Sequence, residues 1–95
     1  MHSQGKIKVE EAESIAAGAF SALARDEERL ERFFELTGLR PETIRQAAAS
    51  DGFLAAVLDY VASEEELLLA VAGALSIRPE RVMAARHVLS PVAFE

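Results

Sequence analysis

The residues of this chain that could do chemistry are its two histidines, its carboxylates and its serines. His87 follows Glu80 by seven residues, whereas the glutamate and histidine of a di-iron bundle motif lie three apart. His2 stands in a polar N-terminal segment, and the run at 64–66 (EEE) opens an expected helix, where the dipole stabilises acidic side chains. Since the chain also lacks cysteine, we expect no metal and no other cofactor.

Catalytic motifs are also missing from the pattern. No serine stands in a Gly-x-Ser-x-Gly motif, and the five glycines are scattered singly, so no phosphate-binding loop is expected. A small helical domain leaves little room for a deep polar pocket. We therefore expect that the protein is not an enzyme.

The most distinctive local motif, residues 38–45 (GLRPETIR), resembles the turn and the start of the recognition helix in a helix-turn-helix. Under this alternative, the candidate nucleic-acid contacts are Arg40, Arg45 and Gln46. Phe34 stands four residues before the turn glycine, where the motif needs a small side chain. A net charge of −6 also repels phosphate backbones, so the sequence disfavours nucleic acid as a partner.

The elements that position these residues are all expected to be helices, because alanine, leucine, glutamate and arginine dominate and no strand-like alternation occurs. We predict an all-α, single compact bundle of five or six short helices, with a flexible arm at 1–8 and one helical domain at 9–95. The predicted helices cover 9–24, 26–37, 41–50, 52–62, a segment through 67–75, and 79–89.

Capping signals and apolar faces support these boundaries. Asp26 is expected to cap the second helix and Gly38 to end it, with Leu30, Phe33, Phe34 and Leu36 on its buried side. Ser63 and Glu66 have the residue types and the three-residue spacing of a capping box, which predicts that a helix begins after Ser63. The segment 67–75 (LLLAVAGAL) has no polar side chain, so we expect it to be the central helix, packed on helices 26–37 and 52–62.

Two segments of the chain have similar sequences: residues 39–44 (LRPETI) and, 38 positions later, residues 77–82 (IRPERV). Each segment follows a predicted helix that begins with acidic residues. In each, a tight turn leads to a proline that begins the next predicted helix. True duplication of a helical hairpin and convergence on similar turns both explain this similarity.

Longer stretches of the chain, including residues 26–33 (DEERLERF), 51–60 (DGFLAAVLDY), 65–70 (EELLLA) and 85–89 (ARHVL), resemble the bacterial, mostly alphaproteobacterial family called domain of unknown function 3572. The resemblance implies a bacterial, cytoplasmic protein and brings no catalytic or binding residue with it. The composition agrees with a cytoplasmic location and no membrane association: no apolar run approaches the roughly 20 residues of a membrane span, and residues 1–8 (MHSQGKIK) lack the apolar stretch of a signal peptide.

The function that the sequence favours is a small non-catalytic protein-interaction module. With 51% hydrophobic residues, a chain of 95 residues has more apolar surface than it can bury, and leftover patches mark interfaces. The candidate interaction surface comprises Phe20, Tyr60, Val92 and Phe94. The partner would be another protein or a second copy in a homodimer, while the tail at 92–94 could instead pack on its own domain. The alternatives are a helix-turn-helix DNA-binding protein or a small-ligand-binding regulator, in which Phe33, Phe34 and Phe53 would border an apolar pocket.

Overall fold

The computed structural model describes residues 7–40, 42 and 51–89, and these residues form helices and turns without any strand. The helices are α1 (Val9–Leu23), α2 (Glu27–Thr37), α4 (Asp51–Ala62), α5 (Glu65–Leu75) and α6 (Pro79–Leu89). The predicted all-α bundle is confirmed. The helix predicted over 41–50 lies outside the described residues except for Glu42. Within the predicted arm, Ile7 is half-buried and packs against the core.

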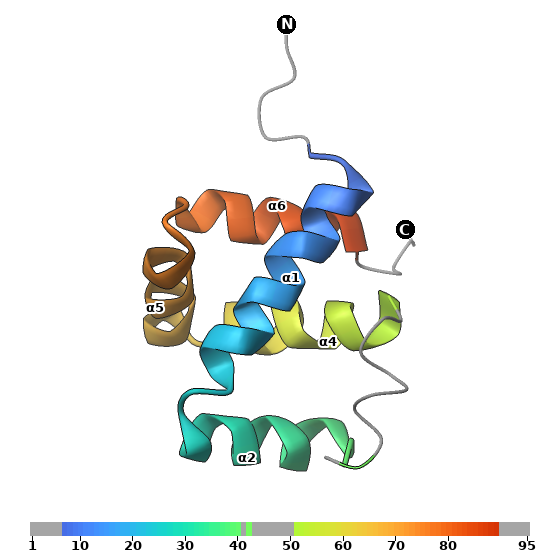
Figure 1. Cartoon of the computed structure of the whole chain (residues 1–95), viewed down its shortest axis with the longest axis vertical. Coiled ribbons are helices and arrows are strands. Elements are labelled where there is room, and N and C mark those ends of the chain that lie inside the picture. Colours follow the sequence, from blue (N-terminus) through green and yellow to red (C-terminus); the bar gives the residue numbers. More distant parts are fainter. Residues whose placement is uncertain (1–6, 41, 43–50, 90–95) are drawn as a thin grey trace, which may run out of the picture.

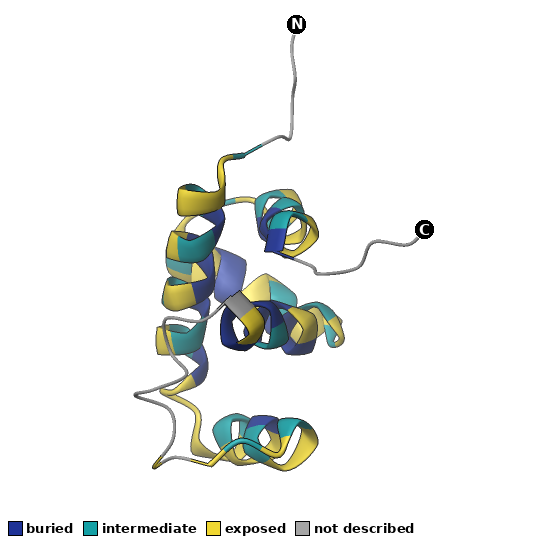
Figure 2. Cartoon of the chain, turned by 90° about the vertical axis from the view of Figure 1, so that its right-hand side faces the viewer, coloured by how far each residue is buried: buried dark blue, intermediate teal, exposed yellow. Residues whose placement is uncertain are grey.

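Helix α1 crosses a layer formed by three other helices. Figure 1 shows α6, α4 and α2 one below another with α1 running across them, and Figure 2 shows α1 on one side of that layer. Helix α5 closes one end of the layer and contacts α1, α4 and α6. Helix α2 packs against α1 and α4 less extensively than α6 does, so it is the outlying member of the bundle.

Small side chains on α1 allow this crossing. Ala12, Ala16 and Ala19 are completely buried. At Gly18, an added Cβ would lie 2.8 Å from the Leu75 Cδ2, so the glycine leaves room for the end of α5. Helix α4 contributes more of the larger core side chains than any other described helix, with Val57, Leu58 and Val61 fully enclosed. Burying this apolar surface is the main stabilising contribution to the fold.

The ends of α2 follow the predicted capping signals. Asp26 Oδ1 accepts hydrogen bonds from the backbone N–H groups of Glu28 (3.1 Å) and Arg29 (3.3 Å). At the other end, Gly38 adopts a left-handed conformation with φ 76°, and its N–H donates to the Phe34 carbonyl. These contacts satisfy backbone groups that a helix end leaves without partners.

The capping box predicted at Ser63 and Glu66 is wrong. Helix α5 begins one residue later than that motif requires, with Glu64 as its N-cap and no side-chain cap hydrogen bond. The Ser63 hydroxyl instead donates to the Tyr60 carbonyl at 2.7 Å, which satisfies an acceptor at the end of α4. The short connection between α4 and α5 therefore uses Ser63 to end one helix, not to begin the next.

The central position predicted for residues 67–75 is also wrong. Only Leu67, Val71 and Ala72 of α5 are buried, whereas Leu69 is 52% exposed. The predicted packing on helix 52–62 (α4) is confirmed, but the other main contacts of α5 are with α1 and α6, and not with α2. The helix lies at the end of the bundle, and Leu69 on its outer side remains in solvent because no other described helix covers it.

The two similar segments follow helices of the same length that end in the same backbone conformation. Helices α2 and α5 begin 38 residues apart, at Glu27 and Glu65, and each has 11 residues. Each ends at a left-handed residue, Gly38 with φ 76° and Ser76 with φ 59°. Both copies thus end in the same backbone geometry, although only the first has the residue type that adopts it without strain.

This difference predicts that Ser76→Gly stabilises the protein by about 0.5–1 kcal/mol, because relief of left-handed strain outweighs the added freedom of the unfolded chain. Thermal unfolding followed by circular dichroism should show a midpoint higher by several degrees. The reciprocal variant, Gly38→Ser, should lower it. A Ser76→Gly midpoint below that of the wild type would contradict this account.

Candidate functional site

Leu36 is the most exposed large apolar side chain in the described part of the chain, at 68%. The sequence places it on the buried side of α2 with Phe33, and that prediction is wrong. Helix α2 packs sparsely, so only Phe33 is fully enclosed, while Leu30 and Phe34 are half-buried. Leu36 lies at the rim of this contact and faces solvent.

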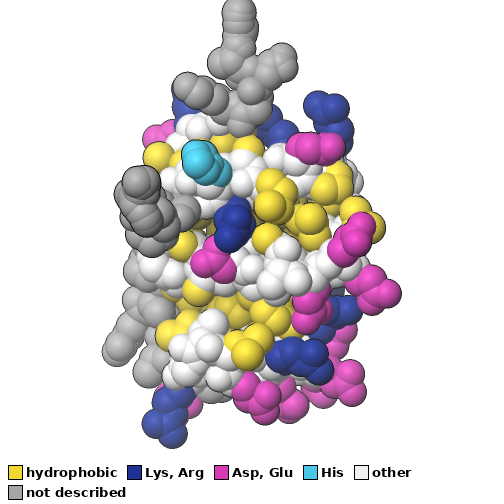
Figure 3. Space-filling view, turned by 180° about the vertical axis from the view of Figure 1, so that it is seen from behind, with side chains coloured by type: hydrophobic (Ala, Val, Ile, Leu, Met, Phe, Trp, Pro, Cys, Tyr) yellow, Lys and Arg dark blue, Asp and Glu magenta, His cyan; other side chains and the backbone are white. Residues whose placement is uncertain are grey.

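A shallow groove of about 270 Å³ runs beside Leu36, and we call it the α2–α4 groove. Its lining residues are Leu36 and Thr37 from the end of α2, Ala56, Asp59 and Tyr60 from α4, and Ser63 after it. Figure 3 shows hydrophobic side chains gathered between α4 and α2 on this face of the molecule. Asp59 stands at the α4 side of the groove and accepts a hydrogen bond from Arg86 Nε at 2.8 Å. The groove is therefore apolar along most of its length, with a charged pair at one edge.

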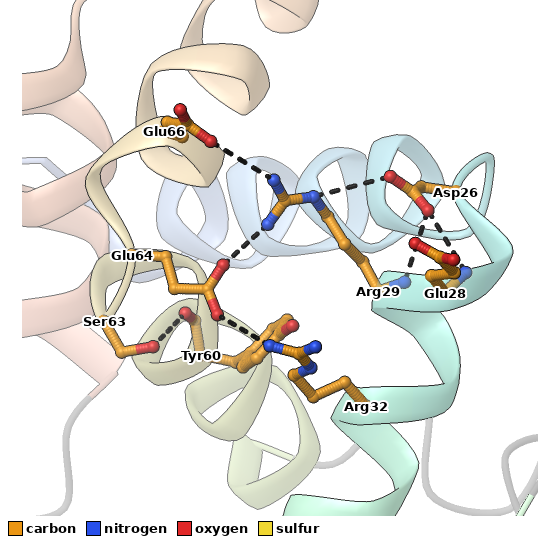
Figure 4. A network of polar contacts seen from close by, with 8 residues as sticks. All are labelled: Asp26, Glu28, Arg29, Arg32, Tyr60, Ser63, Glu64 and Glu66. Carbon is orange, nitrogen blue, oxygen red and sulfur yellow. Dashed lines mark hydrogen bonds and ion pairs between the residues drawn. The ribbon is translucent and has the colours of Figure 1, made fainter.

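A network of charged side chains fastens α2 to the connection between α4 and α5 (Figure 4). Arg29 Nη1 donates to Glu64 Oε1 at 2.6 Å, and Arg29 Nε lies 3.4 Å from Asp26 Oδ2. Arg32 Nη1 approaches the second oxygen of Glu64 at 3.9 Å. The hydrogen bond with Glu64 raises the pKa of the Arg29 guanidinium, which thus stays charged. This network holds the first half of α2 in place.

The three-residue spacing of Asp26 and Arg29 allows an ion pair within α2, but Arg29 also has a closer partner outside that helix. Its shortest charged contact is with Glu64, 35 residues along the chain. No local spacing rule can identify such a pair, because helix periodicity describes only neighbours on one helix. Glu64 is thus a site residue that the sequence does not reveal.

Tyr60 joins the groove to this network. Its side chain lines the groove, yet the residue is only 5% exposed, and its hydroxyl makes no hydrogen bond of normal geometry to any described residue. Burial raises the pKa of the Tyr60 phenol, and the negative charge of Glu64 raises it further, while Arg32 and Arg29 have weaker opposing effects. The phenol is therefore kept neutral, and it occupies the base of the site as an apolar ring.

The raised pKa gives a testable pH dependence. The unfolded chain loses its tyrosine proton near pH 10, before the folded chain does, so this contribution to stability is present below about pH 10 and is lost as the pH rises through the folded pKa. Because the chain has one tyrosine and no tryptophan, tyrosinate absorbance reports Tyr60 alone. We expect a titration midpoint above that of the urea-unfolded chain.

The matched variant is Tyr60→Phe. Since the buried hydroxyl makes no hydrogen bond of normal geometry to a described residue, its removal should leave stability at neutral pH unchanged or slightly higher. The variant should also lose less stability than the wild type above about pH 10. A folded-state midpoint at or below the unfolded one would contradict the assignment.

Negative charge is concentrated around the same site. Residues 25–35 and 64–66 carry eight carboxylates and three guanidinium groups, a net charge of −5 in a chain whose total is −6. All of these side chains are exposed except Arg29 and Glu64, which are half-buried. Acidic side chains are visible along the lower edge of Figure 3, over α2.

The sequence-predicted interaction residues do not form one exposed surface. Tyr60 is buried, and Phe20 is half-buried with its ring centroid 5.2 Å from that of Phe53, so both prove to be packing residues. Their burial follows from the crossing of α1 over α4 and α2, which encloses the aromatic side chains. Val92 and Phe94 lie outside the described residues.

The residues of the alternative predictions are also placed only in part. Arg40 is exposed and lies 3.6 Å from Glu42, while Arg45 and Gln46 fall outside the described residues. The Phe33 ring contacts those of Phe34 and Phe53 at centroid distances of 5.8 and 6.0 Å, so these aromatics pack on one another. Within residues 7–40, 42 and 51–89, no group of three acidic or histidine side chains could hold a metal ion.

Comparisons with known proteins give one family. A family model described as "Protein of unknown function (DUF3572)" matches residues 9–92. No curated protein and no solved structure matches the chain. Among the helices that the structure describes, none has both the length and the apolar character needed to cross a membrane.

Proposed function

The chain belongs to the DUF3572 family, and since the family's description states no activity, we propose a function from the molecule's own surface. The protein is a non-catalytic interaction module that binds a protein partner through the α2–α4 groove. The observation that carries this proposal is the exposure of Leu36 beside an apolar groove on the outlying helix of the bundle.

The energetics of Leu36 support a docking role. Full burial of a leucine side chain stabilises by about 1.5–3 kcal/mol, and most of that contribution is not used in the isolated chain because the side chain is 68% exposed. A partner that covers Leu36 and the adjoining Ala56 would gain it. Charged and polar groups around an apolar centre are the usual arrangement of a protein interface.

The proposal gives the charged groups around the groove a positioning role. Arg29 faces Glu64, and Arg86 faces Asp59, so each guanidinium already has a carboxylate partner. The Arg29–Glu64 pair joins α2 to the turn that follows α4, so it connects the two helices that form the walls of the groove. The Arg86–Asp59 pair joins α6 to the α4 wall. A rigid groove binds more tightly than a mobile one because less freedom is lost on association.

Affinity capture with matched baits tests the proposal. The baits are the wild type, Leu36→Gln and Leu69→Gln, which replace two exposed leucines with a neutral helix-forming residue. We expect the wild type and Leu69→Gln to retain the same partner from a lysate of the source cells, and Leu36→Gln to lose it. Retention of the same proteins by all three baits would contradict the proposal.

A further inference from the structure

We infer that the segment bound in the α2–α4 groove is a basic amphipathic helix, with an aliphatic side chain against Leu36 and lysine or arginine side chains toward α2. This inference rests on the proposed function, and it adds the chemistry of the partner. Two independent observations lead to it: the distribution of charge around the groove, and the kind of backbone that forms its walls.

The charge argument begins with α2. Glu28, Glu31 and Glu35 line a further surface groove of about 270 Å³ together with Arg32. They are spaced three and four residues apart and therefore lie along one side of the helix. Glu35, the last of this row, is the chain neighbour of Leu36, so the row ends within one residue of the α2–α4 groove without lining it. A segment seated against Leu36 passes beside these carboxylates, which favour cationic side chains.

The same charge disfavours the other occupants. In a symmetric dimer the same surface meets itself, so the acidic row of α2 in one copy would approach the interface together with the same row of the other copy. Like charges opposed in this way are unfavourable unless they are screened. A nucleic-acid backbone would be repelled for the same reason.

The secondary structure of the groove walls indicates which secondary structure the bound partner segment has. Both walls are α-helices, whose backbone N–H and C=O groups are bonded within each helix. An extended peptide that adds a strand needs an open backbone edge, and the groove offers none. Recognition must therefore use side chains alone, which suits a helix that presents apolar anchors at three- and four-residue spacing.

The experiment uses two synthetic helical peptides with the same leucines at three- and four-residue spacing. One has lysine at the remaining positions and the other has glutamate. Binding to the full chain is measured by fluorescence anisotropy at low and at physiological salt. We expect the leucine–lysine peptide to bind at least tenfold more tightly than the leucine–glutamate peptide, with an affinity that falls as salt increases.

Matched variants locate the binding. Leu36→Gln should weaken the leucine–lysine peptide about tenfold, whereas Leu69→Gln should leave it unchanged, and circular dichroism checks that both remain folded. The double variant Glu31→Gln/Glu35→Gln should weaken it about threefold to tenfold. Its control, Glu10→Gln/Glu80→Gln, removes the same charge from exposed positions on α1 and α6 and should have little effect.

The outcomes separate the two proposals. Equal binding of both peptides, with a loss in Leu36→Gln, would overturn the basic partner and leave the groove as a docking site. Equal weakening by the two glutamate pairs would also overturn it, since net charge alone would then explain the attraction. If either peptide bound to the Leu36→Gln variant as tightly as to the wild type, the proposal that the groove is the docking site would be overturned.

Discussion

Phe33→Ala should destabilise the protein by about 3–5 kcal/mol, the cost of removing a large aromatic side chain from a closed site. Phe33 is fully buried, and it is the only residue of α2 that is. Its ring contacts those of Phe20, Phe53 and Tyr60 at centroid distances of 5.8 to 6.2 Å, so it joins α2 to both α1 and α4. The other apolar contacts of α2 are sparse, because Leu30 and Phe34 are only half-buried.

The expected loss is a large share of the total, because a domain of 95 residues has a free energy of unfolding of about 5–14 kcal/mol. Urea unfolding followed by far-ultraviolet circular dichroism measures it. Leu36→Ala is the control on the same helix and should change stability by no more than about 0.5 kcal/mol, because Leu36 is exposed. Similar losses in the two variants would show that α2 is not anchored through Phe33.

The second large effect is expected at Leu67. Leu67→Ala should cost about 2–5 kcal/mol, because this side chain is buried where α5 meets the rest of the core. Leu69→Ala, two residues further along the same helix, should change stability by at most about 0.5 kcal/mol. The pair keeps residue type and helix constant, and it varies only burial.

Thermal or urea unfolding of both variants measures this contrast. If α5 were enclosed on all sides, as its composition alone predicts, both substitutions would be costly. A loss above about 2 kcal/mol in Leu69→Ala would therefore contradict the placement of α5 at the end of the bundle.

Local signals predict most of the helix boundaries. Asp26 and Gly38 define α2 because their side-chain and backbone preferences act within a few residues, and the structure shows both contacts. Signals of this kind succeed because the chain needs no information from distant segments to satisfy them.

Tertiary arrangement is less predictable. The apolar run at 67–75 predicts a central helix. The position of a helix in a bundle depends on how many other helices surround it, and the hydrophobicity of its own residues does not give that number. Leu36 reads as buried because it shares a helix side with Phe33, but the short contact of α2 covers only part of that side. Ser63 and Glu66 fit a capping box, although the Ser63 hydroxyl is used by the end of α4.

The candidate site was predictable only in outline. Excess apolar surface predicts an interface somewhere, and Tyr60 is named by that reasoning, but it forms the buried base of the groove. The exposed element is Leu36, which sequence periodicity assigns to the core. The bond between Arg29 and Glu64 joins residues far apart in sequence, so it becomes visible only in the folded chain.

Nuclear magnetic resonance mapping tests the central claim, that the α2–α4 groove is a docking site, most directly. The isotopically labelled full chain is titrated with the leucine–lysine peptide, and backbone amide shifts are followed residue by residue. The account predicts that the largest shifts occur at Leu36, Thr37, Ala56, Asp59, Tyr60 and Ser63. Shifts concentrated instead around Leu69 and Met83, the exposed apolar side chains of α5 and α6, would contradict it.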